Sequence, residues 1–134
     1  MSSSIIGKYM VRIAIIEDDV HIRNMYVLKL KQQGFNVKGA SDGKEGLSLI
    51  EQHMPDLILL DLRMPVMSGQ EMLKRLREQD WGKNMLVIIL TNLSQSEASM
   101  DLRLLRIEKY IVKAHYTPKQ VVDAVTEILV RYKK

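Results

Sequence analysis

The chain has 134 residues, a formal net charge of +4 at pH 7 and no cysteine. A chain of this length forms one domain with a sizeable core, and the lack of cysteine excludes a disulfide framework, a thiolate zinc site and a cysteine nucleophile. The longest apolar run, residues 85–90, is far shorter than the about 20 residues of a membrane span, and residues 1–10 contain no apolar stretch of signal-peptide length, so we expect a soluble cytoplasmic protein without membrane contact.

Five short apolar segments have the character of buried β-strands: residues 11–16, 35–39, 57–60, 85–90 and 110–112. Several of them are apolar throughout rather than alternating, as in strands of a parallel sheet that helices cover on both faces. Residues 1–9 precede the first strand and are interpreted as an N-terminal tail. A single domain is expected to span residues 10–134.

Segments with the apolar spacing of helices lie between these strands. Three helix starts are marked by a capping box, in which a hydroxyl lies three residues before Glu or Gln, at Ser68, Ser94 and Thr117. Pro118 follows Thr117 at the first helical position, where its missing N–H is harmless. The alternation of strands and helices predicts five β/α units, (βα)5, with a parallel sheet between two layers of helices.

Polar residues follow four of the predicted strands directly. The first strand ends at Glu17 and Asp18, the third at Asp61, the fourth at Thr91 and the last at Lys113. In an open parallel sheet, ligands bind beyond the carboxyl ends of the strands. We therefore expect these five side chains to meet at one edge of the sheet.

The residue types at this edge point to a particular chemistry. Glu17, Asp18 and Asp61 crowd like charges, which favours a bound cation, and a few oxygen ligands are typical of Mg2+. Lys113 and Thr91 add a positive charge and a hydroxyl donor, so the set reads as an anion site organised by a metal, with a phosphoryl group carried on a carboxylate nucleophile. The chain has no Gly-rich nucleotide loop, so the phosphoryl donor is expected to be something other than bound ATP.

The same motifs resemble the receiver domain of two-component response regulators over nearly the whole chain, from about residue 11 to residue 132. Five stretches carry the resemblance: IIEDD (15–19), the DG turn (42–43), LILLDLRMPVMSG (57–69), VIILT (87–91) and YIVK (110–113). The resemblance implies a flavodoxin-like, three-layer doubly wound α/β fold with strand order 2-1-3-4-5. Because the sequence ends at Lys134, directly after the fifth predicted helix, we expect a stand-alone, single-domain member of a phosphorelay.

The resemblance implies a role for each residue at the sheet edge. Asp61 is expected to accept the phosphoryl group, while Thr91 and Lys113 bind its oxygens. Tyr110 occupies the aromatic switch position, which moves inward when Thr91 is drawn to the phosphate. The expected Mg2+ ligands are Asp18 and Asp61 directly, Glu17 mainly through water, and Arg63 through its backbone carbonyl. Such a chain is a phosphoacceptor rather than an enzyme, with at most self-catalysed phosphorylation and dephosphorylation.

The partners implied are a histidine kinase or phosphotransfer protein as donor and a downstream protein target. The basic residues of the second half are scattered and no aromatic residues interleave with them, which favours a solvated face over DNA binding. The expected docking surface is the fourth helix, last strand and fifth helix around Tyr110, with Arg103, Arg106 and Lys109. A homodimer through the same face is the alternative use of that surface.

Several residues depart from the family pattern. Ala114 follows Lys113 where the family has proline after a cis peptide, and Asn92 follows Thr91 where a very small residue is usual. Arg63 and Ser68 are also not the commonest choices in their loop. The pair Arg106-Ile107 replaces Gly-Ala before the last strand, so the fourth helix is expected to end differently.

Two alternative functions compete with a phosphorylated receiver. A haloacid-dehalogenase-type phosphatase needs a second acid two residues after its nucleophile, where this chain has Arg63. A degenerate receiver would serve only as a phosphorylation-independent protein-binding module, and whether Asp61 can be phosphorylated discriminates it. The three histidines, His21, His53 and His115, lie too far apart for a local metal motif and are expected at the surface.

Overall fold

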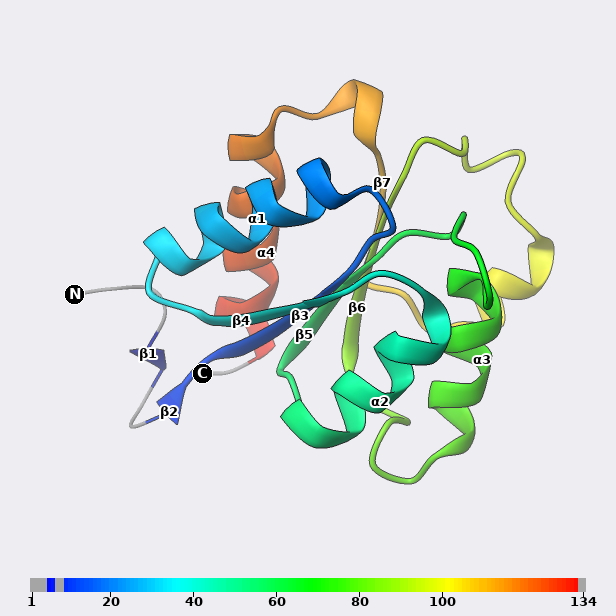
Figure 1. Cartoon of the computed structure of the whole chain (residues 1–134), viewed down its shortest axis with the longest axis horizontal. Helices are drawn as coiled ribbons and strands as arrows, with labels where there is room; N and C mark the ends of the chain where they lie inside the picture. The colour runs from blue at the N-terminus through cyan, green and yellow to red at the C-terminus, as the bar shows by residue number, and fades with distance from the viewer. Residues whose placement is uncertain (1–4, 7–8, 133–134) are drawn as a thin grey trace.

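The computed structural model describes residues 5–6 and 9–132 and centres on one parallel sheet (Figure 1). Its strands are β3 (Arg12–Ile16), β4 (Asn36–Ala40), β5 (Leu57–Leu60), β6 (Leu86–Thr91) and β7 (Lys109–Val112). They are all parallel and lie in the order β4-β3-β5-β6-β7. When the five strands of this sheet alone are numbered along the chain, the order is 2-1-3-4-5, which confirms the predicted doubly wound fold. β5 matches its predicted segment, β3 and β7 differ from theirs by one residue at the first position, and β4 and β6 are shifted by one residue at both ends.

Helices cover both faces of the sheet (Figure 1). They are α1 (Val20–Gln32), α2 (Gly43–His53), α3 (Gly69–Glu78), the 3-10 helices η1 (Met100–Leu105) and η2 (Lys113–His115), and α4 (Pro118–Tyr132). One apolar core lies between the sheet and the pair α1 and α4, and a second lies between the sheet and α2, α3 and η1. In β5, Leu57 and Leu59 belong to the first core while Ile58 and Leu60 belong to the second. This double burial is the reason the strand is apolar throughout.

Two of the three predicted capping boxes begin helices. The Ser68 hydroxyl accepts from the Glu71 amide at 3.2 Å at the start of α3. Thr117 and Gln120 cap α4 reciprocally, at 3.2 and 2.8 Å. The predicted helix after Ser94 is wrong, because the Ser94 hydroxyl donates to the Glu97 carboxylate at 2.6 Å in a turn that does not continue. The short 3-10 helix η1 begins later, at Met100.

Two short segments before β3 form an antiparallel pair. Ile5–Ile6 (β1) pairs with Tyr9–Met10 (β2). Residues 1–4 and 7–8 of the predicted tail lie outside the described residues, so the division of the chain at residue 10 stays a prediction. None of the helices in the described part of the chain combines the length and apolar character needed to span a bilayer.

His53 corrects one sequence-based expectation. It lies at the C-terminal end of α2 and is buried, not exposed at the surface as expected. Burial lowers its pKa, and the nearby cations of Lys38 and Arg12 lower it further, against the opposing influence of the backbone at Asn36 and Ile13. His53 lies on an element that contributes no residue to the predicted site.

Candidate functional site

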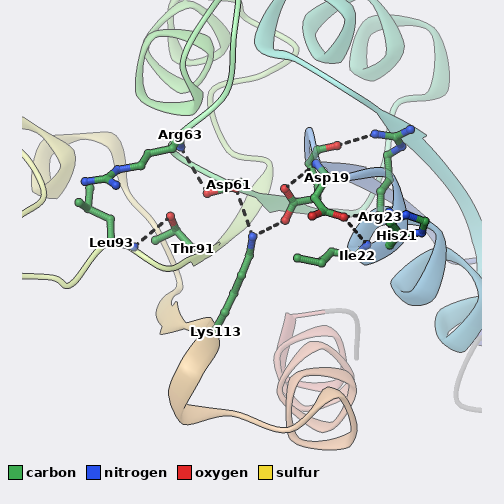
Figure 2. A network of polar contacts seen from close by, with 10 residues as sticks. Asp19, His21, Ile22, Arg23, Asp61, Arg63, Thr91, Leu93 and Lys113 are labelled. Atoms are coloured by element: carbon green, nitrogen blue, oxygen red, sulfur yellow. Dashed lines mark hydrogen bonds and ion pairs between the residues drawn. The ribbon is translucent and has the colours of Figure 1, made fainter.

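Asp61, Thr91 and Lys113, three of the predicted site residues, lie near one another at the carboxyl edge of the sheet (Figure 2). Backbone hydrogen bonds extend the ladder past the strand ends, from the Glu17 amide to the Ala40 carbonyl and from the Asp61 amide to the Ile16 carbonyl, both at 3.0 Å. Glu17, Asp61 and Thr91 are 3, 6 and 1 % exposed. The sheet therefore holds these polar groups out of water at a defined place.

Three carboxylates form the acidic part of the site. Oxygen atoms of Glu17, Asp18 and Asp61 lie within 4.8 Å of one another, and Asp18 is the exposed member. Burial raises the pKa of Glu17 to about 7; a hydrogen bond from Lys113 opposes that rise and the charge of Asp61 adds to it. Because the three carboxylates repel one another when they are ionised, a nearby cation stabilises their charged forms.

Lys113 supplies one positive charge to this cluster. Its ammonium donates hydrogen bonds to the Glu17 carboxylate and, at 3.2 Å, to Oδ2 of Asp61 (Figure 2). Burial alone would lower the pKa of Lys113, but the hydrogen bond to Glu17 and the charges of both acids outweigh burial and raise it. Three carboxylates and one ammonium leave an excess of two negative charges, and the all-oxygen donor set fits a divalent hard cation such as Mg2+.

The third acid of the first loop has a structural task. Oδ1 of Asp19 accepts from the amides of His21 and Ile22 at 2.9 and 3.0 Å, so Asp19 is the N-cap of α1. These hydrogen bonds, with that from Ile22 foremost, lower the pKa of Asp19. The cap directs the chain from the end of β3 into α1 and leaves Glu17 and Asp18 at the sheet edge.

Sequence reasoning missed Arg23, which braces the same loop. One of its terminal guanidinium nitrogens donates to the backbone carbonyl of Glu17 at 2.8 Å (Figure 2). A Cβ at Gly39 would lie 3.0 Å from Cδ of Arg23, so the glycine leaves room for the arginine stem. A basic residue in the first helical turn after an acidic loop is a sequence pattern that could have identified Arg23. The same pattern is common, however, in helices where the basic residue has no such role.

The loop after β5 surrounds Asp61. Oδ1 of Asp61 accepts from the Arg63 amide at 3.3 Å, and the Arg63 side chain extends away from Asp61 (Figure 2). The Gly69 amide donates to the Leu62 carbonyl at 3.0 Å. A Cβ at Gly69 would lie 1.9 Å from the Asp61 carbonyl oxygen, so only glycine can approach this backbone so closely.

Thr91 and Tyr110 are joined through the segment that follows β6. The Leu93 amide donates to the Thr91 hydroxyl at 3.4 Å. The Tyr110 hydroxyl donates to the Leu93 carbonyl at 2.7 Å and to the Ser94 carbonyl at 3.3 Å. Burial raises the pKa of Tyr110, and nearby acidic charges add to the rise. Leu93 therefore makes hydrogen bonds with both Thr91 and Tyr110.

Two departures in the sequence leave the site assembled. The Lys113–Ala114 peptide bond is trans, like every peptide bond in the described residues, and the Lys113 ammonium still contacts both Glu17 and Asp61. Asn92 is exposed beside the buried Thr91. The structure thus brings Glu17, Asp18, Asp61 and Lys113 into one cluster.

Comparisons with known proteins agree with this geometry. A sequence-family model described as a response regulator receiver domain matches residues 13–126. A curated relative, a probable transcriptional regulator ycf27 of Porphyridium aerugineum, is 32% identical over 123 residues, which cover 92% of this chain and 50% of that protein. The chain spans about half the length of the curated relatives that it matches.

Two solved structures are similar over nearly all of this chain. Chemotaxis protein CheY4 of Vibrio cholerae superposes with a TM-score of 0.82 at 27% identity, covering 90% of this chain and 100% of that one. Response regulator protein TrrA of Thermotoga maritima, in complex with Mg(2+)-BeF, gives a TM-score of 0.78 at 27% identity with the same coverage.

Proposed function

The chain belongs to the response regulator receiver domain family of two-component signalling, and from that premise we propose that it is a switch phosphorylated on Asp61. One observation carries the proposal. The Asp61 carboxylate is 6 % exposed, lies 3.2 Å from the Lys113 ammonium and belongs to a three-carboxylate cluster suited to Mg2+. A buried carboxylate beside a cation and a metal site is suited to nucleophilic attack on a phosphoryl group.

The proposed reaction moves a phosphoryl group from a phosphohistidine of a kinase or phosphotransfer protein. An Asp61 carboxylate oxygen attacks phosphorus, the bond from phosphorus to the donor nitrogen breaks, and its electron pair stays with the imidazole. Lys113 and the Thr91 hydroxyl hold the phosphoryl oxygens, while Asp18, Asp61, Glu17 and the Arg63 carbonyl are the proposed metal ligands. Bound Mg2+ would neutralise negative charge on the carboxylate and phosphoryl oxygens.

The proposed output is a change in protein binding. Drawing the Thr91 hydroxyl toward the phosphoryl group removes it from the Leu93 amide, and Leu93 is one of the residues that hold Tyr110. Tyr110 borders a hollow of about 330 Å³ beside η1, where Arg103 and Arg106 supply positive charge. A protein target is therefore proposed at the face formed by η1, β7 and α4.

The other expectations about partners stay predictions. They are stand-alone action, a cytoplasmic location, and a homodimer through the η1, β7 and α4 face as the alternative to a separate target. Direct DNA binding is not proposed for the residues described here, and salt-dependent, sequence-specific duplex binding by the purified chain would contradict that view.

Phosphorylation by a small donor tests the proposal. With acetyl phosphate and Mg2+, intact mass should show one added phosphoryl group, and a chelator should abolish it. Asp61→Asn should also abolish it, because an amide is a poor nucleophile. Asp80→Asn is the matched control, since the Asp80 side chain is 95% exposed and paired only with Lys83 among the ion pairs described. Equal labelling of wild type and Asp61→Asn would contradict the proposal and favour a phosphorylation-independent binding module.

A further inference from the structure

Arg77 on α3 makes an unusual set of contacts with the backbone. Its half-buried guanidinium donates to five carbonyl oxygens: Leu105 at 2.8 Å, Gly82 at 2.9 Å, Lys83 at 3.2 Å, Met85 at 2.9 Å and Arg106 at 2.8 Å. A charged group that leaves water must be compensated by hydrogen bonds. Arg77 receives that compensation entirely from the main chain of two other segments.

The two segments are the loop 82–85, between α3 and β6, and the C-terminal end of η1. Arg106 lies at that end with φ 55 and ψ 67, in the left-handed region that residues with a side chain seldom adopt. Its carbonyl accepts from Arg77. The Arg77 contact thus stabilises the conformation by which the chain leaves η1 and enters β7, at the position where the sequence departs from the glycine of its family.

The start of the same connection is held differently. Between β6 and η1, the described hydrogen bonds to the segment include those from Tyr110 to the Leu93 and Ser94 carbonyls and from Leu93 to Thr91. These bonds link the segment to Thr91, which lies near Asp61 at the same sheet edge (Figure 2). One end of the connection is therefore linked to the site, and the other end is tied to α3 by Arg77.

We propose that Arg77 is a positioning residue that fixes the C-terminal end of η1, so that a change at Thr91 rearranges the connection only between residues 92 and 99. The rearrangement of residues 92–99 after a change at Thr91 rests on the proposed function. A partner at the η1 face then meets the exposed Met100 and Leu104 in constant positions, while Tyr110 and residues 92–99 change. Arg77 sets the boundary between the fixed and the moving part of the docking face.

Hydrogen–deuterium exchange of the full chain tests the proposal, with peptides that separate residues 92–99 from 100–108. Arg77→Lys keeps the charge, but an ammonium cannot reach carbonyls in both segments. Without ligand, Arg77→Lys should speed exchange in 100–108 about tenfold. The matched control is Arg75→Lys, since Arg75 lies on the same helix, is exposed and pairs only with Glu71 among the described contacts. Its exchange in 100–108 should equal that of wild type.

The response to Mg2+ with beryllium fluoride, which stands in for the phosphoryl group, provides the readout that a merely structural arginine would not alter. In wild type the change in exchange should be confined to 92–99, and in Arg77→Lys it should extend into 100–108. The proposal would be overturned if Arg77→Lys exchanged residues 100–108 at the same rate as wild type. It would also be overturned if the mimic changed exchange in residues 100–108 of wild type. Failure of wild type to bind the mimic would instead count against the proposed function, while the ligand-free comparison still tests the anchor.

A second variant keeps the proposal testable if Arg77→Lys does not fold. Tyr110→Phe removes the hydroxyl that holds Leu93 and Ser94 and leaves the Arg77 contacts in place. It should speed exchange in 92–99 and leave 100–108 unchanged. Faster exchange in both segments would contradict the boundary at η1.

Discussion

Lys113 pairs with two buried carboxylates, Glu17 and Asp61, and its side chain is 14% exposed. Removing one partner of a buried pair leaves the other charge uncompensated, which costs more than the loss of an exposed pair. The site is therefore a place where the residues needed for chemistry also set the stability of the fold.

Lys113→Ala should lower the free energy of unfolding by about 3 kcal/mol in the absence of Mg2+, because Glu17 and Asp61 lose their shared cation. Lys119→Ala is the control, since Lys119 is 87% exposed and pairs with Asp123 one turn along α4. Its loss should cost less than about 1 kcal/mol. Urea unfolding of both variants measures the difference, and equal stabilities would show that the Lys113 pair carries no net energy.

His53 makes stability depend on pH in a defined direction. Burial holds its pKa in the folded state below the ordinary value of 6.5, so the unfolded chain binds a proton more readily than the folded one. Its contribution is fully present above about pH 6.5 and is lost as pH falls toward the lower folded pKa. His53→Gln should therefore make the loss of stability on acidification shallower than in wild type.

Urea unfolding at several pH values measures this slope, and the exposed His21, changed to Gln, is the control. A His53→Gln slope identical to that of wild type would contradict the assignment. The position of His53 was not predictable from its own segment, because the neighbours that affect its pKa lie on other elements, β3 and β4.

At the scale of elements, the capping signals show what local sequence determines. Ser68 and Thr117 begin helices because an apolar stripe follows each cap and packs on the sheet: Met72, Leu73 and Leu76 in α3, and Val121, Val122 and Val125 in α4. After Ser94 the corresponding residues are largely polar, and Leu102 is the buried residue of η1. A cap without an apolar face to bury gave only a turn.

The loop between β5 and α3 depends on one glycine. Gly69→Ala would place a methyl group 1.9 Å from the Asp61 carbonyl oxygen, so the backbone carrying the proposed phosphoacceptor must shift. We expect a loss of at least about 2 kcal/mol in the free energy of unfolding and slower phosphorylation by acetyl phosphate.

Gly39→Ala provides a graded control for this prediction. Its nearest neighbour, at 3.0 Å, is the flexible Arg23 side chain, which can move. The substitution should have a smaller effect on both stability and phosphorylation. Equal losses in the two variants, measured by urea unfolding and intact mass, would contradict the importance of the close approach at Gly69.

At the scale of the whole molecule, the parallel sheet explains why so much of the site was predictable. Strand ends are visible in the sequence as polar residues after apolar runs, and parallel pairing places Glu17, Asp61 and Lys113 at one edge. Arg77 was not predictable and Arg23 had only a common pattern to mark it, because each acts on backbone carbonyls whose positions depend on how whole loops are placed. Every residue type has a backbone carbonyl, so a side chain that binds one has no partner that can be recognised by its residue type in the sequence.

The site also depends on both cores. Each strand that delivers a site residue has side chains that belong to or pack against both apolar cores. The acidic loops thus begin at strand ends that are packed on both faces. The proposed change of shape on phosphorylation is accordingly expected in the long connection between β6 and β7, at one edge of the sheet.

Asp61, and not a neighbouring carboxylate, is the proposed acceptor of the phosphoryl group. Borohydride reduces an acyl phosphate to an alcohol, which would convert a phosphorylated aspartate to homoserine and mark its position permanently. After treatment with acetyl phosphate and Mg2+, followed by borohydride and peptide mass spectrometry, we predict homoserine at position 61 and unmodified acids at Glu17 and Asp18. Reduction of Glu17 or Asp18 instead, or no reduced residue in a folded protein, would contradict phosphorylation at Asp61.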